Sequence, residues 1–341
     1  MKTLIIHYTG KKSLEPAAEI LRRGGLVAFP TETVYGLGGN AFDPQAAEKI
    51  YKAKGRPSDN PLIVHLDEYR TAGRFCHTSE LFFELADAFM PGPLTVVLPK
   101  RPFIPDGVTG GLDTVGIRVP SHPIAHELIA LAGVPIAAPS ANLSGKPSPT
   151  TFAHVYHDLN GKVDAIIDGG SCDFGVESTI VKLDNDKIYL LRPGAITPEM
   201  LSLFSDELHI DPSVTEKFDG VPLAPGMKYR HYAPDRPLVI LDGGNKAIYR
   251  FLADKERRAV ICFDEDMAFI QGDHVISCGP KGDSLTQANR LFGCLRALDG
   301  LKDIDVIYAR MPSRVGIGLA VFNRLIKAAG FSVMTLPPDE E

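Results

Sequence analysis

The sequence predicts an α/β protein of two domains: a large twisted mixed sheet with its helices, followed by a smaller α/β domain. The chain has 341 residues, more than twice a typical domain of about 150 residues. Short apolar runs alternate with amphipathic stretches, except around residues 209–235, where the proline-rich stretch VPLAPGMKYRHYAPDRP intervenes. We therefore predict a first domain over residues 1–208, a linker over 209–235 and a second domain over 236–341.

Eight short runs rich in Val, Ile and Leu predict the strands of the first domain. Each is bounded by Gly, Pro or Asp, as strands usually are. The runs are 26–29, 62–66, 95–99, 114–119, 134–138, 163–168, 178–183 and 187–191. Helices are predicted to begin at Asp43-Pro44, His122-Pro123 and Thr197-Pro198, because proline is favoured in the first turn after a capping residue.

A second alternating series follows the linker. It predicts strands at 237–241, 258–263, 274–278, 304–309 and 331–336, and helices at 244–255, 284–298 and 317–329. This order predicts a compact Rossmann-like unit with a parallel sheet. No GxGxxG follows its first strand, so the sequence does not indicate dinucleotide binding there.

The composition bounds the class of protein. A net charge of -6 argues against a protein that grips nucleic acid over a broad surface, although a local basic site is compatible with it. Five widely spaced cysteines without a CxxC pair favour reduced thiols over disulfides or structural zinc. Neither a membrane-spanning run nor a signal peptide is recognisable, since Lys11 and Lys12 soon follow the short apolar run LII. We expect a cytoplasmic protein.

Three polar doublets lie just beyond predicted strands or a short helix. In each, two polar side chains stand at i and i+2 in backbone predicted to be non-helical, which would turn both to the same side. The doublets are Thr31/Thr33, Lys54/Arg56 and Ser140/Asn142. Lys54 and Arg56, held by Gly55 and Pro57, predict a triphosphate clamp, because lysine supplies a point charge and arginine a bidentate fork. The simpler alternative is a solvated pair favoured by the helix dipole.

Other polar positions also allow a structural interpretation beside a functional one. Ser140 and Asn142 can simply cap a turn, and the segment APSANLSGKPSPT is not a Walker A motif, because proline follows its GK. His65 lies within the apolar run LIVHL, and a lone histidine in an apolar strand is usually a core residue. Arg118 in TVGIRVP needs an anionic partner if buried, either a ligand carboxylate or an internal Asp or Glu. Arg192 and Ser178 raise the same choice.

Taken together, these segments resemble the threonylcarbamoyl-AMP synthase family, which is built on the YrdC-like domain. The matching stretches are FPTETVYGLG, KGRPSDNPLIVH, MPGPLTVVL, TVGIRVPSHP, APSANLSGKPSPT, FGVESTIV and LLRPGAIT. The linker APGMKYRHYAP is similar to that of the two-domain branch, which appends a Rossmann-like domain. The resemblance covers essentially the whole chain and keeps the motif order.

The resemblance implies a nucleotidyltransferase that condenses L-threonine, bicarbonate and ATP to threonylcarbamoyl-AMP and releases pyrophosphate. The product would be the activated intermediate for threonylcarbamoyl modification of adenosine in tRNA. ATP would be the cosubstrate, with Mg²⁺ bound through its phosphates. The downstream tRNA threonylcarbamoyl-transferase machinery would be a transient partner. Nothing in the sequence demands a membrane or an oligomer, so a monomer is expected.

The resemblance also implies roles for individual residues. Lys54 and Arg56 would hold the phosphates as the catalytic pair. Further nucleotide contacts would come from Thr114, Ser140, Asn142, Ser148, Arg192 and Tyr232. L-Threonine would be held by Thr31, His65, Arg118, Ser178 and the backbone of Ala138. Arg118 would bind its carboxylate. The linker would close the site as a lid through Lys228, Tyr229, Arg230, His231 and Tyr232.

Three other interpretations compete with this one. An RNA-binding module is disfavoured by the acidic net charge and by the lack of interleaved basic and aromatic residues outside the linker. The hydrogenase maturation carbamoyltransferase shares only the core domain and adds acylphosphatase and cysteine-rich zinc modules, whose patterns are absent here. A structural or interaction role accounts for the second domain but leaves the polar doublets of the first without a purpose.

Overall fold

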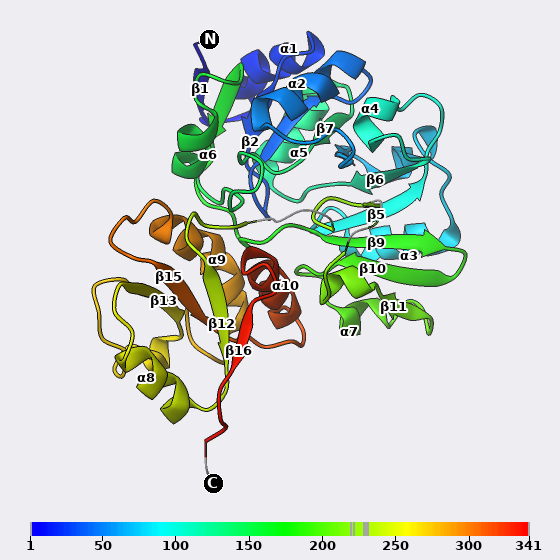
Figure 1. Ribbon diagram of the computed structural model, residues 1–341. Coiled ribbons are helices and arrows are strands. Elements are labelled where there is room, and N and C mark those ends of the chain that lie inside the picture. The colour runs from blue at the N-terminus through cyan, green and yellow to red at the C-terminus, as the bar shows by residue number, and fades with distance from the viewer. Residues whose placement is uncertain (1, 219, 221, 228–231, 340–341) are drawn as a thin grey trace. The chain divides into compact units, whose positions relative to one another are not determined.

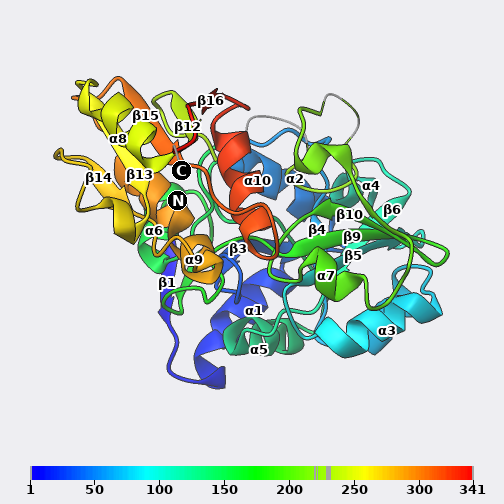
Figure 2. The same cartoon turned by 90° about the horizontal axis from the view of Figure 1, so that it is seen from below.

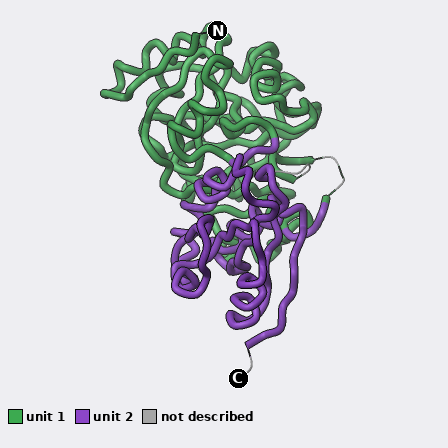
Figure 3. Tube along the Cα trace, turned by 60° about the vertical axis from the view of Figure 1, so that its left-hand side comes forward, with its two compact units in different colours: residues 1–144, 148–214, 218–229 green, residues 145–147, 215–217, 230–341 purple. Residues whose placement is uncertain are grey.

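The computed structural model describes residues 2–218, 220, 222–227 and 232–339 (Figure 1 and, turned by 90°, Figure 2). The chain divides into two compact units (Figure 3). The first unit comprises residues 1–144, 148–214 and 218–229, and the second comprises 145–147, 215–217 and 230–341. The predicted linker, 209–235, is therefore divided between the two units.

Among the described residues, the first unit is built on an 11-stranded mixed sheet of order β1-β8-β2-β3-β7-β4-β6-β5-β9-β10-β11. Its strands are β1 (Leu4–His7), β2 (Val27–Phe29), β3 (Gly36–Asn40), β4 (Ile63–His65), β5 (Leu94–Pro99), β6 (Thr114–Arg118), β7 (Ile136–Ala138), β8 (Ala165–Asp168), β9 (Thr179–Asp184), β10 (Lys187–Arg192) and β11 (Leu208–Ile210). All eight predicted strands are confirmed to within a few residues. β1, β3 and β11 were not predicted.

The described helices of the first unit are α1 (Glu15–Arg22), α2 (Pro44–Lys54), α3 (Glu80–Phe89), α4 (Asp106–Thr109), α5 (Pro123–Ala132), α6 (Phe152–Leu159) and α7 (Pro198–Leu201), with 3₁₀ turns at Lys11–Leu14, Tyr69–Arg74 and Pro212–Val214. Three of them, α2, α5 and α7, begin where capping residues and proline predicted them, and the starts of the other described helices were not predicted. At α2, the Asp43 carboxylate accepts a hydrogen bond from the Gln45 amide (2.9 Å), and Pro44 occupies the first turn. None of the described helices combines the length and apolarity that a bilayer crossing demands.

Both faces of the sheet are covered by apolar side chains. Val27 and Phe29 of β2 pack with α1 and α5, which lie side by side on one face (Figure 2). Ala28, between them, belongs to the larger cluster on the opposite face, which includes residues of α2 and α3. Because the strand ends therefore lie between two apolar layers, polar residues placed there are shielded from water.

The second unit carries a five-stranded sheet of order β14-β13-β15-β12-β16 within the described residues, with every pair parallel as predicted. Its elements are β12 (Leu238–Asp242), α8 (Asn245–Ala253), β13 (Arg258–Cys262), a 3₁₀ turn (Asp264–Asp266), β14 (Val275–Ser277), α9 (Ser284–Leu298), β15 (Val306–Arg310), α10 (Gly318–Ala328) and β16 (Val333–Thr335). The predicted strands and helices of this series are confirmed.

Candidate functional site

Lys54 joins the end of α2 to the loop that follows β7. Its side chain is buried, and its Nζ donates to the backbone carbonyls of Ser140 and Asn142. The Ser144 amide donates to the Lys54 carbonyl (2.8 Å), and the Ser140 hydroxyl donates to Asn142 Oδ1 (2.5 Å). Two of the three polar segments noted in the sequence, 86 residues apart, thus meet at one place.

The backbone predicted for Lys54 and Arg56 was wrong. Lys54 is the last residue of α2 rather than a residue of extended chain, and Gly55 follows as a left-handed C-cap (φ 62°, ψ 36°). Arg56 extends to a different part of the chain from Lys54: its Nη2 donates to the carbonyls of Asn60 (3.2 Å) and Pro61 (3.1 Å). A glycine that reverses the chain removes the alternation on which the same-side argument relied.

For the other two doublets the same-side prediction is confirmed. Thr31 and Thr33, both buried beyond β2, bring their hydroxyls within 2.9 Å of each other. Thr31 Oγ1 also donates to the Val34 carbonyl (2.6 Å), which fixes the local turn. The hydrogen bond between Ser140 and Asn142 shows the same convergence after β7.

Arg118, at the end of β6, has an internal acidic partner. Its Nη2 donates to Glu32 Oε1 (2.7 Å) and to Thr33 Oγ1 (2.9 Å), and the arginine and glutamate side chains are almost fully buried. Within the described part of the chain, Arg118 Nε and Glu32 Oε2 are buried without a hydrogen-bond partner. The pair therefore retains one donor and one acceptor in a dry environment. Sequence reasoning missed Glu32, whose only signal was its place between the two threonines.

His65 lies beside Arg118 in the parallel pair β4–β6. Burial, with a further contribution from the Arg118 charge, lowers the pKa of His65 to about 3. Its neutral ring donates from Nδ1 to the Ile63 carbonyl (3.1 Å) and meets Phe29 edge-on. On the other side of β4, Ile63 pairs with Ala138 of β7.

Ser178 and Arg192, expected to face different substrates, are bonded to each other. Arg192 Nε donates to the Ser178 carbonyl (3.0 Å), and Nη2 donates to the Ser178 hydroxyl (3.1 Å). That hydroxyl also lies 2.8 Å from Thr95 Oγ1, a contact that the sequence did not indicate. Thr95 is on β5, next to β6 in the sheet, so this group neighbours the Arg118 strand.

Part of the linker packs on the sheet of the first unit. Ala224 and Met227 belong to an apolar cluster with Ile63, Val97 and Ile180. A small pocket there is lined by Thr95, Thr114, Leu223, Ala224 and Pro225, among others. Arg192 Nη1 donates to the Pro225 carbonyl (3.3 Å). Four of the predicted lid residues, Lys228, Tyr229, Arg230 and His231, lie outside the described residues.

Three other predicted or noted residues have clear local surroundings. Tyr232 is part of the second unit, where its ring lies 5.0 Å from that of Phe292. Ser148 donates to Glu177 Oε1 (2.6 Å), and both side chains are buried. Lys146 bonds the carboxylate of Asp299 (2.9 Å) and that of Asp235 (2.5 Å), so its amine is already neutralised by two acids.

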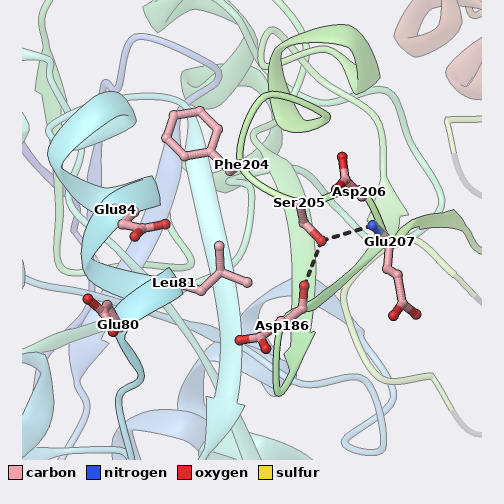
Figure 4. Close-up of a pocket in the computed structure, with 8 residues that line it drawn as sticks. All are labelled: Glu80, Leu81, Glu84, Asp186, Phe204, Ser205, Asp206 and Glu207. Atoms are coloured by element: carbon pink, nitrogen blue, oxygen red, sulfur yellow. Dashed lines mark hydrogen bonds between the residues drawn. The ribbon is translucent and has the colours of Figure 1, made fainter.

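Two surface hollows of the first unit differ in chemistry. One is lined by five carboxylates, Glu80, Glu84, Asp186, Asp206 and Glu207, with Ser205 bonded to the Asp186 carbonyl and the Glu207 amide (Figure 4). Its charge repels a polyphosphate. The other gathers basic and aromatic side chains outside the linker, which corrects the argument made against RNA binding. It is lined by Phe42, Gly73, Arg74, Phe75, Arg101 and Phe103.

Comparisons with known proteins agree along the chain. The family model Sua5_yciO_yrdC, described as "Telomere recombination", matches residues 19–194, and "Threonylcarbamoyl-AMP synthase, C-terminal domain" matches residues 196–330. The chain is 45% identical over 332 residues to a threonylcarbamoyl-AMP synthase from Bacillus subtilis, covering 96% of this chain and 95% of that one. A threonylcarbamoyl-AMP synthase from Pyrococcus abyssi is 44% identical over 333 residues, covering 93% of this chain and 94% of that one.

A solved structure is similar over both units. The crystal structure of P. abyssi Sua5 complexed with L-threonine aligns with a TM-score of 0.92 at 42% identity, covering 98% of this chain and 99% of that one. Thr31, Thr33, Lys54, His65, Arg118, Asn142, Ser178 and Arg192 form a buried polar band in the first unit. With the mixed sheet and the second parallel sheet, this band defines a YrdC-like α/β protein with an appended Rossmann-like unit. The sequence identity of 45% and 44% to the two named relatives shows the family as well as the fold. The chain belongs to the threonylcarbamoyl-AMP synthase family.

Proposed function

We propose that this chain makes threonylcarbamoyl-AMP from L-threonine, bicarbonate and ATP, as a nucleotidyltransferase that supplies tRNA threonylcarbamoyladenosine modification. The observation that carries the proposal is the buried Arg118–Glu32 pair with its unused donor and acceptor. A zwitterionic amino acid offers a carboxylate to the arginine and an ammonium to the glutamate. Family membership supplies the reaction that uses such an amino acid.

The chemistry asks for positioning more than for covalent catalysis. The threonine ammonium first loses a proton. The free amine then attacks bicarbonate with loss of water, or carbon dioxide with loss of a second proton, to give N-carboxy-threonine. Its new carboxylate attacks the α-phosphorus of ATP, the bond to the bridging oxygen breaks, and pyrophosphate leaves. Neither step needs a protein nucleophile, so alignment and charge stabilisation supply the rate enhancement.

The threonine site is assigned to Thr31, His65, Arg118, Ser178 and the Ala138 backbone. Arg118 binds the carboxylate, and neutral His65 adds no charge beside it. The Thr31–Thr33 hydroxyl pair supplies hydrogen bonds for the threonine side chain. Ser178, held by Arg192, borders both substrates.

The nucleotide site is assigned to residues of the first unit: Lys54, Arg56, Thr114, Ser140, Asn142, Ser148 and Arg192. Lys54 now bonds two carbonyls of the loop after β7, and ATP phosphates would draw its amine from them. The linker would close over the bound substrates as a lid, exclude water and protect the mixed anhydride. Its packing against the sheet near Thr114 supports that role.

Magnesium fits the site as an ion carried by the nucleotide. No group of three His, Cys, Asp or Glu suited to a metal exists among the residues the structure describes. Mg²⁺ commonly keeps water and phosphate ligands and needs few from protein. When bound, it would neutralise phosphate charge as pyrophosphate leaves, while Lys54 and Arg56 orient the chain of phosphates.

The test is pyrophosphate release by Arg56→Ala, with Arg101→Ala as its matched control. Both arginines are half-buried and donate to backbone carbonyls, so their structural losses are comparable. Loss of a charge-stabilising group typically costs 10²–10³ in rate, so about a hundredfold loss is expected for Arg56→Ala alone. Equal rates for the two variants would remove Arg56 from the nucleotide site.

A second candidate, RNA binding, is favoured by one observation. Phe42 and Phe103 are exposed in a hollow shared with Arg74 and Arg101, a combination suited to unpaired bases and phosphates. Filter binding of tRNA without ATP or threonine tests it.

We propose further that the protein is a cytoplasmic monomer that meets the downstream transferase machinery transiently.

A further inference from the structure

The first helix of the second unit binds a carboxylate at its N-terminus. β12 ends at Asp242, Gly243 and Gly244 follow, and α8 begins at Asn245. The amides of Asn245 and Lys246 donate to the two oxygens of Asp339, at 2.8 and 2.9 Å. The helix has no side-chain cap from its own N-cap residue. A carboxylate from a segment more than 90 residues away therefore neutralises this end of the helix.

The backbone is shaped for the close approach of this group. A Cβ added to Gly244 would lie 2.2 Å from the Asp339 nitrogen and 2.5 Å from its Oδ1. The Gly244 amide also donates to the Pro337 carbonyl (2.9 Å). The backbone conformation of Gly244 does not itself require glycine, because its φ of -69° suits other residues. Glycine is required because Asp339 fills the space that a Cβ would occupy.

Arg310 brings a second, independent feature to the same place. This side chain, 5% exposed, ends β15, the strand beside β12, and its Nη2 donates to Asn245 Oδ1. Its Nε lies 3.0 Å from Asp266, whose oxygens already accept from the Tyr249 hydroxyl and the Phe263 amide. Arg310 Nη1 is buried without a hydrogen-bond partner in the described residues. A buried donor left unpaired is costly, and an anion bound here would satisfy it.

The N-terminus of α8 and Arg310 lie at the carboxyl ends of neighbouring strands, where parallel α/β sheets commonly bind ligands. Asp242 and Arg310 end neighbouring parallel strands, and a glycine turn leads from the first of them into a helix. A helix N-terminus reached through glycine is a common phosphate site. The Asp339 pKa is lowered chiefly by the two amide hydrogen bonds, with Lys246 and Arg310 contributing, so the place favours negative charge.

We propose that Gly244, the α8 amides and Arg310 form a binding site for a phosphate group, and that Asp339 occupies it as an internal competing ligand. A phosphate would take the two amides, reach Arg310 Nη1 and displace the segment after β16. This site lies within the second unit and does not depend on the proposed synthesis. The simpler alternative is that Asp339 only caps α8.

The experiment compares inorganic phosphate binding to full-length wild type, Asp339→Ala and Asp339→Ala/Gly244→Val. A tethered competitor acts at a millimolar effective concentration, so its removal should lower the dissociation constant of phosphate at this site by about tenfold. Hydrogen exchange at the amides of Asn245 and Lys246 should slow on phosphate addition in Asp339→Ala. The valine side chain should abolish both effects by filling the space that Gly244 leaves.

The variants share an unaltered first unit, so phosphate bound there cancels in the comparison. Pyrophosphate release should be equal in all three proteins, which separates failure of this site from failure of the proposed function. Wild-type phosphate affinity and unchanged amide exchange in Asp339→Ala would show that Asp339 is a helix cap and nothing more. The same conclusion follows if Gly244→Val leaves the tighter binding intact.

Discussion

The charges of the site are set by burial at single residues, and His65 is the clearest case. Its pKa is lowered to about 3 from the ordinary 6.5, mainly because the folded protein shields the ring from water. The unfolded chain therefore binds a proton at a pH at which the folded chain does not. Stability from this group is complete above pH 6.5 and is lost as the pH falls toward 3.

The free energy of unfolding should accordingly fall with pH below 6.5, by up to about 1.4 kcal/mol per pH unit from His65 alone. Urea unfolding at pH 7, 6 and 5 measures the slope. His65→Gln should flatten it, whereas the exposed His7→Gln should not. Identical slopes for wild type and His65→Gln would show that this ring is not buried in its neutral form.

The Arg118–Glu32 pair predicts a selective effect on threonine. Glu32→Gln keeps an oxygen for Arg118 but removes the charge offered to the threonine ammonium. Hydrogen bonds to charged groups contribute about 1.5–3 kcal/mol, so the KM for threonine should rise roughly 10- to 100-fold while that for ATP stays the same. Steady-state pyrophosphate release measures both constants. An unchanged threonine KM, or an equal rise for ATP, would contradict the assignment.

At this scale the sequence identified most charged residues but not their partners. Arg118 was recognisable because a buried arginine needs an anion, yet whether Glu32 or a ligand supplies it depends on the path of the loop after β2. Lys54 met Ser140 and Asn142 as expected, but chiefly through their backbone carbonyls, with a longer hydrogen bond of 3.4 Å to Asn142 Oδ1. Carbonyl partners depend on the chain path, and the side-chain pattern does not encode them.

Elements were predictable where a local signal was strong. Proline after a capping residue marked α2, α5 and α7, and the Val/Ile/Leu runs marked eight strands of the first unit. β3 was overlooked because its sequence, GLGGN, lacks the apolar alternation that indicates a strand. Its glycines instead allow close packing: a Cβ on Gly38 would lie 2.6 Å from Ile136 Cγ2 and 2.7 Å from Phe29.

Gly38→Ala should therefore destabilise the first unit by about 1–3 kcal/mol, the usual cost of overpacking a core. Gly107→Ala is the matched control, because there the nearest atom to an added Cβ is 3.6 Å away, an ordinary contact. Chemical denaturation should separate the two variants. Equal stabilities would mean that β3 is packed less tightly than the structure indicates.

For the whole molecule, the sequence predicted two domains but not how chain segments are shared between the two units. Residues 145–147 and 215–217 belong to the second unit although they are surrounded in sequence by the first. Lys146 does so through its ion pairs with Asp235 and Asp299. Such long-range pairs leave no local periodicity, so the sequence could not indicate them.

The packing of the linker on the first unit should affect activity. Ala224 is buried against Ile63, Val97 and Ile180, so Ala224→Asp should expel this segment from the sheet. We expect at least about a tenfold loss of pyrophosphate release, because an open site admits water and loses alignment. The exposed Ala130→Asp, in the same unit, serves as control. Full activity in Ala224→Asp would argue against a lid.

The central claim is that one buried polar band in the first unit brings ATP together with carboxylated threonine. Pyrophosphate release from ATP, measured with threonine and bicarbonate each present or omitted, tests it most directly. Release should occur only when both are supplied. The same rate with ATP alone would contradict the claim.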